Sequence, residues 1–175
     1  TNLDSAPCVA YVRQDWLDKT GLSVDVDGDH CLTIDELELI GKTFLEQDPG
    51  ESGNPVGMAF VPYLTADDYG GSGYTINAVT SAFHAFPKLW IKDESGKVIY
   101  GSAAPEMKET LGQLAAWFEE GILDPQFGTR TWDDITALLT NNQLGIAFGP
   151  WHIPDWLLNN VKGMNPEAEF SAFTI

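Results

Sequence analysis

Two kinds of apolar segment alternate along this chain of 175 residues. Short runs rich in β-branched and aromatic residues are typical of strands, and segments with apolar residues at three- and four-residue spacing are typical of helices. The expected strands are residues 8–13, 56–64, 143–151 and 168–175, with a β-hairpin over 89–101. The expected helices are residues 14–20, 34–47, 74–86, 105–120, 132–142 and 154–163. This alternation predicts an α/β fold.

Several helix ends carry recognisable signals. Thr33 and Glu36 form a capping box, T-x-x-E, which predicts that a helix begins near Ile34. Pro105 begins another helix, and Gly121 ends it. Its predicted buried face consists of Met107, Leu111, Leu114, Ala115 and Phe118.

The charge balance excludes some classes of partner. Asp and Glu number 26 against 9 Lys and Arg, which gives a net charge of -17. Nucleic acid and anionic membrane surfaces both require a basic protein surface, so neither is an expected partner. Such acidity suits a secreted protein or one that binds cations.

The stretch "DVDGDHCLTIDE", residues 25–36, nearly matches the spacing of an EF-hand calcium loop. Calcium takes six to eight oxygen ligands, and an EF-hand supplies them from loop positions 1, 3, 5, 7, 9 and 12. These positions are Asp25, Asp27, Asp29, the Cys31 carbonyl, Thr33 and Glu36. The spacing predicts a structural calcium ion, bound weakly enough to suit extracellular millimolar calcium.

Three features of the same stretch depart from an EF-hand. Position 6, normally a glycine with positive φ, is His30; the preceding helix stops at Gly21; and the motif is single. The alternative is an acidic turn in which Thr33 and Glu36 serve only the helix N-terminus. The Glu36 side chain cannot fully satisfy both roles.

The chain has two cysteines, Cys8 and Cys31. In an oxidising compartment they would form a disulfide that ties the acidic loop to the sheet and contributes roughly 3 kcal/mol. The alternative is two free thiols. Near the first strand, Arg13 and Asp15 are expected to form an ion pair that steadies the turn after it.

The sequence carries no GxSxG, HExxH or P-loop motif, and its three histidines leave few options for a general base. The chain is therefore expected not to be an enzyme, with a glycosidase as the catalytic alternative.

Several segments together resemble the family 1 extracellular solute-binding proteins, the lipoprotein receptors of bacterial ABC importers for carbohydrates. They are "YVRQDWLDKTG", "TIDELELIGKTFLEQDP", "LWIKDESGKVIYGSAAPEMKETLGQLAAWFEEGILDPQF" and "LGIAFGPW". They occur in this order over nearly the whole chain. The resemblance implies a type II periplasmic-binding-protein-like fold, with two lobes and a ligand in the cleft between them.

In that family, residues 1–175 would form a single α/β lobe with a mixed sheet flanked by helices, and residues 25–36 would be an inserted acidic loop. The expected partners are a carbohydrate, the first lobe of the same protein and an ABC permease, with the protein itself a monomer. The expected location is extracellular, lipid-anchored in the full-length protein by an anchor that this chain lacks. Relatives carry an Asp- and Gly-rich loop after the long helix, where this chain has "DPGESGNP" at 48–55.

The resemblance and the expected strand ends together place the ligand. Trp151 in "GPW" follows a strand and would stack on a sugar ring, with His152 donating a hydrogen bond. The other ligand candidates are Tyr63, Asp67, Asp68 and Trp132. The remaining tryptophans, Trp16, Trp90, Trp117 and Trp156, are expected to be buried or half-buried. The alternative function is a calcium-stabilised extracellular structural or adhesion module without a small-molecule ligand.

Overall fold

A computed structural model describes residues 9–61 and 75–175, so Cys8, Tyr63, Asp67 and Asp68 lie outside the described residues. Its helices are α1 (Gln14–Thr20), α2 (Ile34–Gln47), α3 (Asn77–Ala82), α4 (Glu106–Glu119), α5 (Trp132–Thr140) and α6 (Asn159–Met164). Its strands are β1 (Val9–Arg13), β2 (Trp90–Lys92), β3 (Val98–Tyr100), β4 (Ile146–Gly149) and β5 (Phe170–Phe173). Within these described ranges, no helix combines the length and apolar character that crossing a membrane requires.

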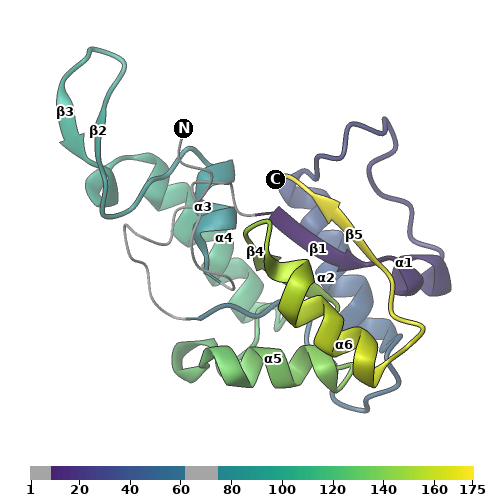
Figure 1. Ribbon diagram of the computed structural model, residues 1–175. Helices are drawn as coiled ribbons and strands as arrows, with labels where there is room; N and C mark the ends of the chain where they lie inside the picture. Colours follow the sequence, from purple (N-terminus) through teal and green to yellow (C-terminus); the bar gives the residue numbers. More distant parts are fainter. Residues whose placement is uncertain (1–8, 62–74) are drawn as a thin grey trace.

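The main sheet has the order β4-β1-β5, with β1 antiparallel to both neighbours (Figure 1). Ala10 at the centre of the sheet lies opposite Phe148 on one side and Phe173 on the other. Single parallel bridges join Cys31 to Thr174 and Val56 to Leu144, so the pairing is mixed overall. The α/β class predicted from the sequence is confirmed.

The capping box of α2 forms as predicted. The Thr33 hydroxyl accepts a hydrogen bond from the Glu36 backbone N–H, and the Glu36 carboxylate accepts one from the Thr33 N–H. The buried face of α2 includes Leu37, Ile40 and Phe44, and the Phe44 ring meets Trp16 edge to face with centroids 5.2 Å apart. Helix α2 therefore packs against α1 and the sheet in one hydrophobic core.

The strand predicted over 56–64 is wrong for its described part. Residues 56–61 form only isolated bridges, Val56 with Leu144 and Met58 with Leu123. Alternate side chains of residues 58–61 enter different cores. Met58 and Phe60 pack in the cluster around α2, while Ala59 and Val61 pack in the cluster around α5 and α6. A segment that is buried on both sides needs the apolar composition of a buried strand, even where it forms no full ladder of hydrogen bonds.

Two helical predictions also need correction. The helix expected over 74–86 is only Asn77–Ala82, because the chain turns at His84, which has φ 55°. In α4 the predicted face is wrong for Leu111 and Phe118, which are 56% and 45% exposed, while Met107 is buried and Leu114 packs against the core. Trp117 is buried, as expected, and its indole N–H donates to the Glu38 carboxylate at 2.7 Å. This bond to α2 selects which apolar stripe of α4 faces the core.

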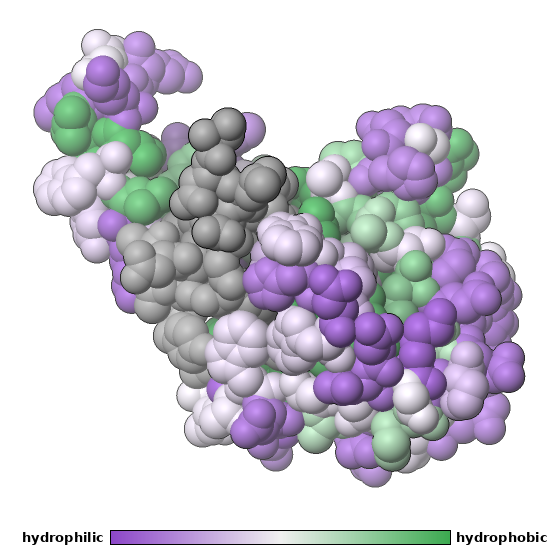
Figure 2. Space-filling view, viewed as in Figure 1, coloured by the Kyte–Doolittle hydropathy of each residue, from purple (hydrophilic) through white to green (hydrophobic). Residues whose placement is uncertain are grey.

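The β2–β3 hairpin projects from the body and carries apolar side chains in solvent (Figures 1 and 2). Its turn is closed by Asp93, whose carboxylate accepts from the backbone N–H of Ser95 and of Lys97. Trp90 lies opposite Tyr100, with ring centroids 5.2 Å apart, and is 73% exposed. The expectation that Trp90 is buried or half-buried is therefore wrong, because a two-stranded hairpin has no layer behind it.

Candidate functional site

The end of β4 carries the predicted sugar-stacking residue. Strand β4 is buried along its whole length and leads directly into Pro150 and Trp151. The buried Tyr11 hydroxyl donates to the Pro150 carbonyl at 3.2 Å, and the Ile153 N–H donates to the same carbonyl at 3.1 Å. The turn is thus held from the sheet and from the following helix, while the Trp151 side chain remains 56% exposed. Trp151 presents an aromatic surface on a fixed backbone.

His152 and Trp132 are the other described candidates for ligand contact. The His152 ring is half-buried and stands edge to face with Trp151, with centroids 5.6 Å apart. Trp132, the first residue of α5, is half-buried against the core cluster that contains Ile153 and Leu157. His152 therefore lies beside the aromatic surface, while Trp132 contributes to the packing of the second core. The contacts predicted for Tyr63, Asp67 and Asp68 lie outside the described residues.

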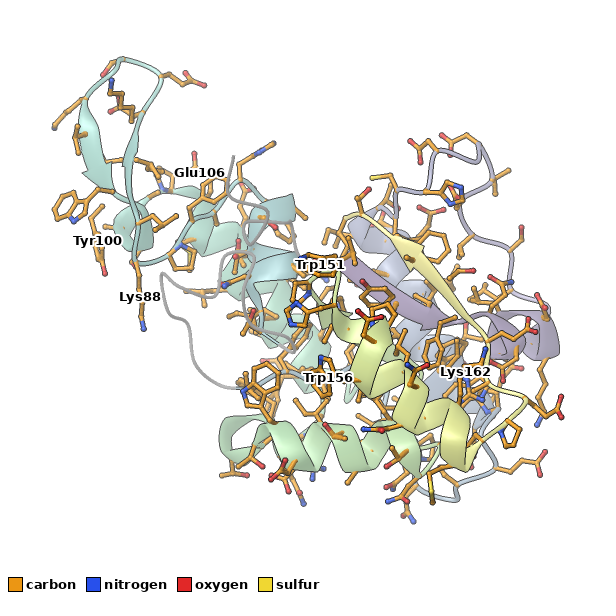
Figure 3. All side chains as sticks on the ribbon, in the orientation of Figure 1. Lys88, Tyr100, Glu106, Trp151, Trp156 and Lys162 are labelled. Carbon is orange, nitrogen blue, oxygen red and sulfur yellow. The ribbon has the colours of Figure 1, made fainter. Side chains whose placement is uncertain are left out.

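Two residues near this surface were not predicted from the sequence. Tyr11 acts through the Pro150 carbonyl, a pairing of residues 139 positions apart that no local pattern indicates. Trp156, expected to be buried or half-buried, is 37% exposed and lies below Trp151 on the same side of the molecule (Figure 3). The only local signal was its position five residues after Trp151 in a segment that begins with a proline.

The acidic loop brings three of its six predicted ligands together. Asp25, Asp27 and Asp29 each offer one carboxylate oxygen, and these oxygens all lie within 4.8 Å of one another. Two oxygens bound to one calcium ion at 2.3–2.6 Å are separated by at most about 5 Å, so the three carboxylates fit one ion. His30 at position 6 has φ 58°, the positive value that this loop position requires. The Cys31 carbonyl and Thr33, at loop positions 7 and 9, follow in the sequence.

Glu36 is engaged in capping. One carboxylate oxygen accepts from the N–H and hydroxyl of Thr33 at 2.9 and 2.8 Å, and the other accepts from the Asp25 N–H at 3.1 Å. These bonds, that from the Thr33 N–H foremost, lower the pKa of Glu36. The side chain therefore links the helix cap to the start of the acidic loop, and the bidentate calcium ligation predicted for Glu36 stays a prediction.

The Glu36 cap predicts a pH dependence of stability. A carboxyl whose pKa is lowered by folding contributes stability above its ordinary value, about 4.3 for Glu, and loses it as the pH falls through the lower folded value. We expect Glu36→Gln to reduce the fall in the thermal midpoint between about pH 5 and pH 3. Thermal unfolding at a series of pH values measures this effect. Glu94→Gln, at the exposed hairpin turn, is the control, and equal pH dependence in the two variants would contradict the prediction.

The loop at 48–55 binds the ammonium group of a lysine side chain, Lys19. The Lys19 ammonium donates to the Pro49 carbonyl at 2.8 Å and to the Glu51 carboxylate at 2.6 Å. The Asp48 carboxylate in turn accepts from the backbone N–H of Ser52 and of Gly53, at 3.1 and 2.7 Å. This loop is therefore closed by protein donors, and the clustered carboxylates are found in the acidic loop at 25–29.

Cys31 is exposed, and the backbone beside it pairs with the end of the chain. The Thr174 N–H donates to the His30 carbonyl, and the Leu32 N–H donates to the Thr174 carbonyl. The acidic loop is thus anchored to the segment that follows β5 by backbone bonds. Cys8 lies outside the described residues, so its disulfide with Cys31 stays a prediction.

No protein-family model and no curated protein sequence matches the chain. Solved structures do match. The S. pneumoniae ABC-transporter substrate-binding protein FusA in complex with kestose has a TM-score of 0.69 and 22% identity, over 96% of this chain and 31% of that one. An EF-hand mutant of FusA in complex with fructo-nystose matches with a TM-score of 0.68 and 21% identity, over 91% of this chain and 29% of that one.

Two further structures give the same result. The extracellular solute-binding protein from Bifidobacterium longum subsp. infantis has a TM-score of 0.69 and 21% identity, over 98% of this chain and 34% of that one. The alginate-binding protein AlgQ2, solved without calcium ion, has a TM-score of 0.67 and 19% identity, over 96% and 32%. The chain therefore spans about a third of each solved chain.

These neighbours are a substrate-binding, a solute-binding and an alginate-binding protein. Their identities to this chain are low, so the agreement lies in the path of the backbone over nearly all of residues 1–175. The chain has the fold of the carbohydrate-binding proteins of ABC transporters that its sequence resembles, over about a third of their length.

Proposed function

We propose that this chain is one lobe of the substrate-binding component of an ABC importer, and that it binds a sugar or oligosaccharide. The observation that carries the proposal is Trp151, a 56% exposed indole on a turn fixed from β1. An exposed tryptophan on a fixed backbone is suited to stack on the apolar face of a sugar ring, because little side-chain freedom is lost on binding. The sugar ligands named for FusA and AlgQ2 support a carbohydrate as the ligand class.

The proposed mechanism is closure of two lobes around the sugar. The carbohydrate docks between this lobe and the first lobe, where aromatic side chains stack on it and polar groups replace its water. The closed form then engages the permease. The protein would act outside the cell as a monomer held by a lipid anchor, as the resemblance implies.

A thermal-shift screen of the full-length protein tests the proposal. The panel contains kestose, nystose, raffinose, stachyose and an alginate oligosaccharide. A ligand that binds only the folded state raises the unfolding midpoint, by about 2.7 kcal/mol of stability at a hundredfold excess over Kd. We expect at least one glycan to raise it. A response to calcium but to no glycan would instead favour the structural or adhesion module.

We further propose that Asp25, Asp27 and Asp29 bind a calcium ion that stabilises the loop. Three carboxylates within 4.8 Å repel one another, and a divalent cation removes this repulsion. The EF-hand named for FusA supports calcium as the ion. The ion would supply structural charge compensation and no chemistry.

Calcium removal gives a direct prediction. With a Kd near 1 mM, 10 mM calcium would add about 1.4 kcal/mol of stability and raise the unfolding midpoint by about 3–5 °C relative to EGTA. Asp27→Asn should abolish this difference, while Asp133→Asn, an exposed substitution on α5, should retain it. A calcium response of equal size in Asp27→Asn and wild type would contradict the prediction. Differential scanning calorimetry gives the midpoints.

A further inference from the structure

The β2–β3 hairpin has one face that is exposed to solvent. Its register places Trp90 opposite Tyr100 and Lys92 opposite Val98, so these four side chains lie on the same face. Trp90 is 73% exposed, Val98 56% and Tyr100 39%. The Trp90 and Tyr100 rings pack together, but this contact leaves most of the indole in solvent. Contiguous apolar surface of this kind is typical of an interaction site.

Lysines without an ion-pair partner surround this face. In the part of the chain that the structure describes, none of Lys88, Lys92 and Lys97 forms an ion pair. The acidic residues between them lie in the turn, where the Asp93 carboxylate accepts backbone N–H groups. A third of the nine Lys and Arg residues thus lies within ten positions of a chain whose net charge is -17. Such a face suits a partner surface that is apolar and carries carboxylates.

The position of the hairpin indicates which surface that is. Strand β1 begins where β5 ends, since Ala10 lies opposite Phe173. The turn after β4 lies at the same end of the sheet, since Gly149 lies opposite Val9. In the proposed full-length protein, the chain passes between this lobe and the first lobe at this end, and the hairpin projects on the side to which β5 runs (Figure 1). A hollow of about 940 Å³ between the hairpin and the segment that leads into α4 leaves room for side chains of the first lobe.

We infer that the β2–β3 hairpin docks on the first lobe, through Trp90, Tyr100 and Lys92, when the two lobes close around a ligand. The inference rests on the proposed function and adds a contact to its closed form. The exposed parts of Trp90, Val98 and Tyr100 amount to roughly 300–400 Å², about half of what one side of a stable interface between separate molecules buries. Such a contact suffices within one chain, because tethering supplies an effective concentration in the millimolar range.

Carbodiimide cross-linking of the full-length protein tests the contact, because it joins an ammonium group to a neighbouring carboxylate. The protein is treated alone and with kestose, nystose, raffinose or stachyose, and the linked peptides are identified by mass spectrometry. We expect links from Lys92 or Lys97 to the first lobe that increase at least about threefold with a glycan that binds. Lys162 is the control, since it is exposed at the end of α6, far from Lys88, and should form no such link (Figure 3).

Trp90→Ala gives a second measurement. Without the indole the closed form is less favoured, so the Kd of each bound glycan should rise about fivefold, through faster dissociation. Trp90→Phe, which keeps an aromatic ring, should recover most of the lost affinity.

The cross-links are measured on wild type and do not depend on the folding of a variant. If glycan binding leaves the links of Lys92 and Lys97 unchanged, the inference is overturned and the proposed function stands. Links between light and heavy copies in an isotope-labelled mixture would assign the face to a second copy and also overturn it. Absence of glycan binding by wild type would overturn both proposals.

Discussion

Replacing Arg13 by alanine is expected to lower the free energy of unfolding by about 3–5 kcal/mol, the range for breaking a buried ion pair by removing one partner. Arg13 is only 4% exposed, and its guanidinium donates to both carboxylate oxygens of Asp15, at 2.7 and 2.6 Å. It also donates to the Asn142 side chain at 2.8 Å and lies over the Trp16 ring, 4.6 Å from its centroid. Alanine leaves the Asp15 charge without its cation and a void beside the indole.

The chain of contacts extends beyond Arg13. Asn142 donates to Asn165 at 2.7 Å, and Asn165 donates to the Thr140 carbonyl at 3.0 Å. One arginine therefore ties the end of β1 to α5 and to the segment that follows α6. Stabilities of 5–15 kcal/mol are usual, so the expected loss is a large share of the total.

Lys19→Ala provides the comparison for this prediction. It removes an ion pair of similar length, Lys19 to Glu51 at 2.6 Å, whose side chains are 49% and 80% exposed. Exposed pairs contribute about 0–1 kcal/mol, so this variant should remain close to wild type. Urea unfolding of both variants gives the two free energies. Equal losses would show that Arg13 does not hold these elements together.

Replacing Trp151 by alanine is expected to cost about 2 kcal/mol or more of binding free energy, roughly a thirty-fold weaker Kd, for every glycan that the full-length protein binds. The indole is the largest exposed apolar side chain on the turn after β4, and stacking on it would bury one of its faces. The loss should be independent of glycan length. Calorimetric titration measures it.

Folding and binding can be separated in this experiment. The Trp151 side chain is exposed and the turn is held by the Tyr11 hydroxyl and the Ile153 N–H, so alanine at 151 should leave the unfolding midpoint nearly unchanged. Trp151→Phe should retain part of the affinity because it keeps an apolar ring. Full affinity in Trp151→Ala would place the sugar elsewhere.

Elements set by local interactions could be predicted from the sequence. The T-x-x-E box at Thr33 gave the start of α2, and Gly21 gave the end of α1, where it has φ 70°. The hairpin turn at residues 93–97 and the helix after Pro105 were also found correctly. Each of these signals acts within five residues, where side-chain and backbone hydrogen bonds decide the conformation.

Features set by distant contacts could not be predicted. Residues 56–61 have the composition of a strand. They nevertheless form only isolated bridges, and their side chains pack between two cores that are built from distant parts of the chain. That α4 leaves Leu111 and Phe118 exposed depends on the bond of the buried Trp117 to Glu38, 79 positions away. For the site, "GPW" indicated Trp151, while the π-turn that exposes Trp156 has no sequence signature.

The central claim, that this chain is a carbohydrate-binding lobe, is tested most directly by calorimetric titration of the full-length protein with defined oligosaccharides. The account predicts saturable heat with a stoichiometry of one for at least one of kestose, nystose, raffinose, stachyose or an alginate oligosaccharide, and its loss or marked weakening in Trp151→Ala. Absence of binding heat for every glycan, from a protein whose folding is verified by a cooperative thermal transition, would contradict it.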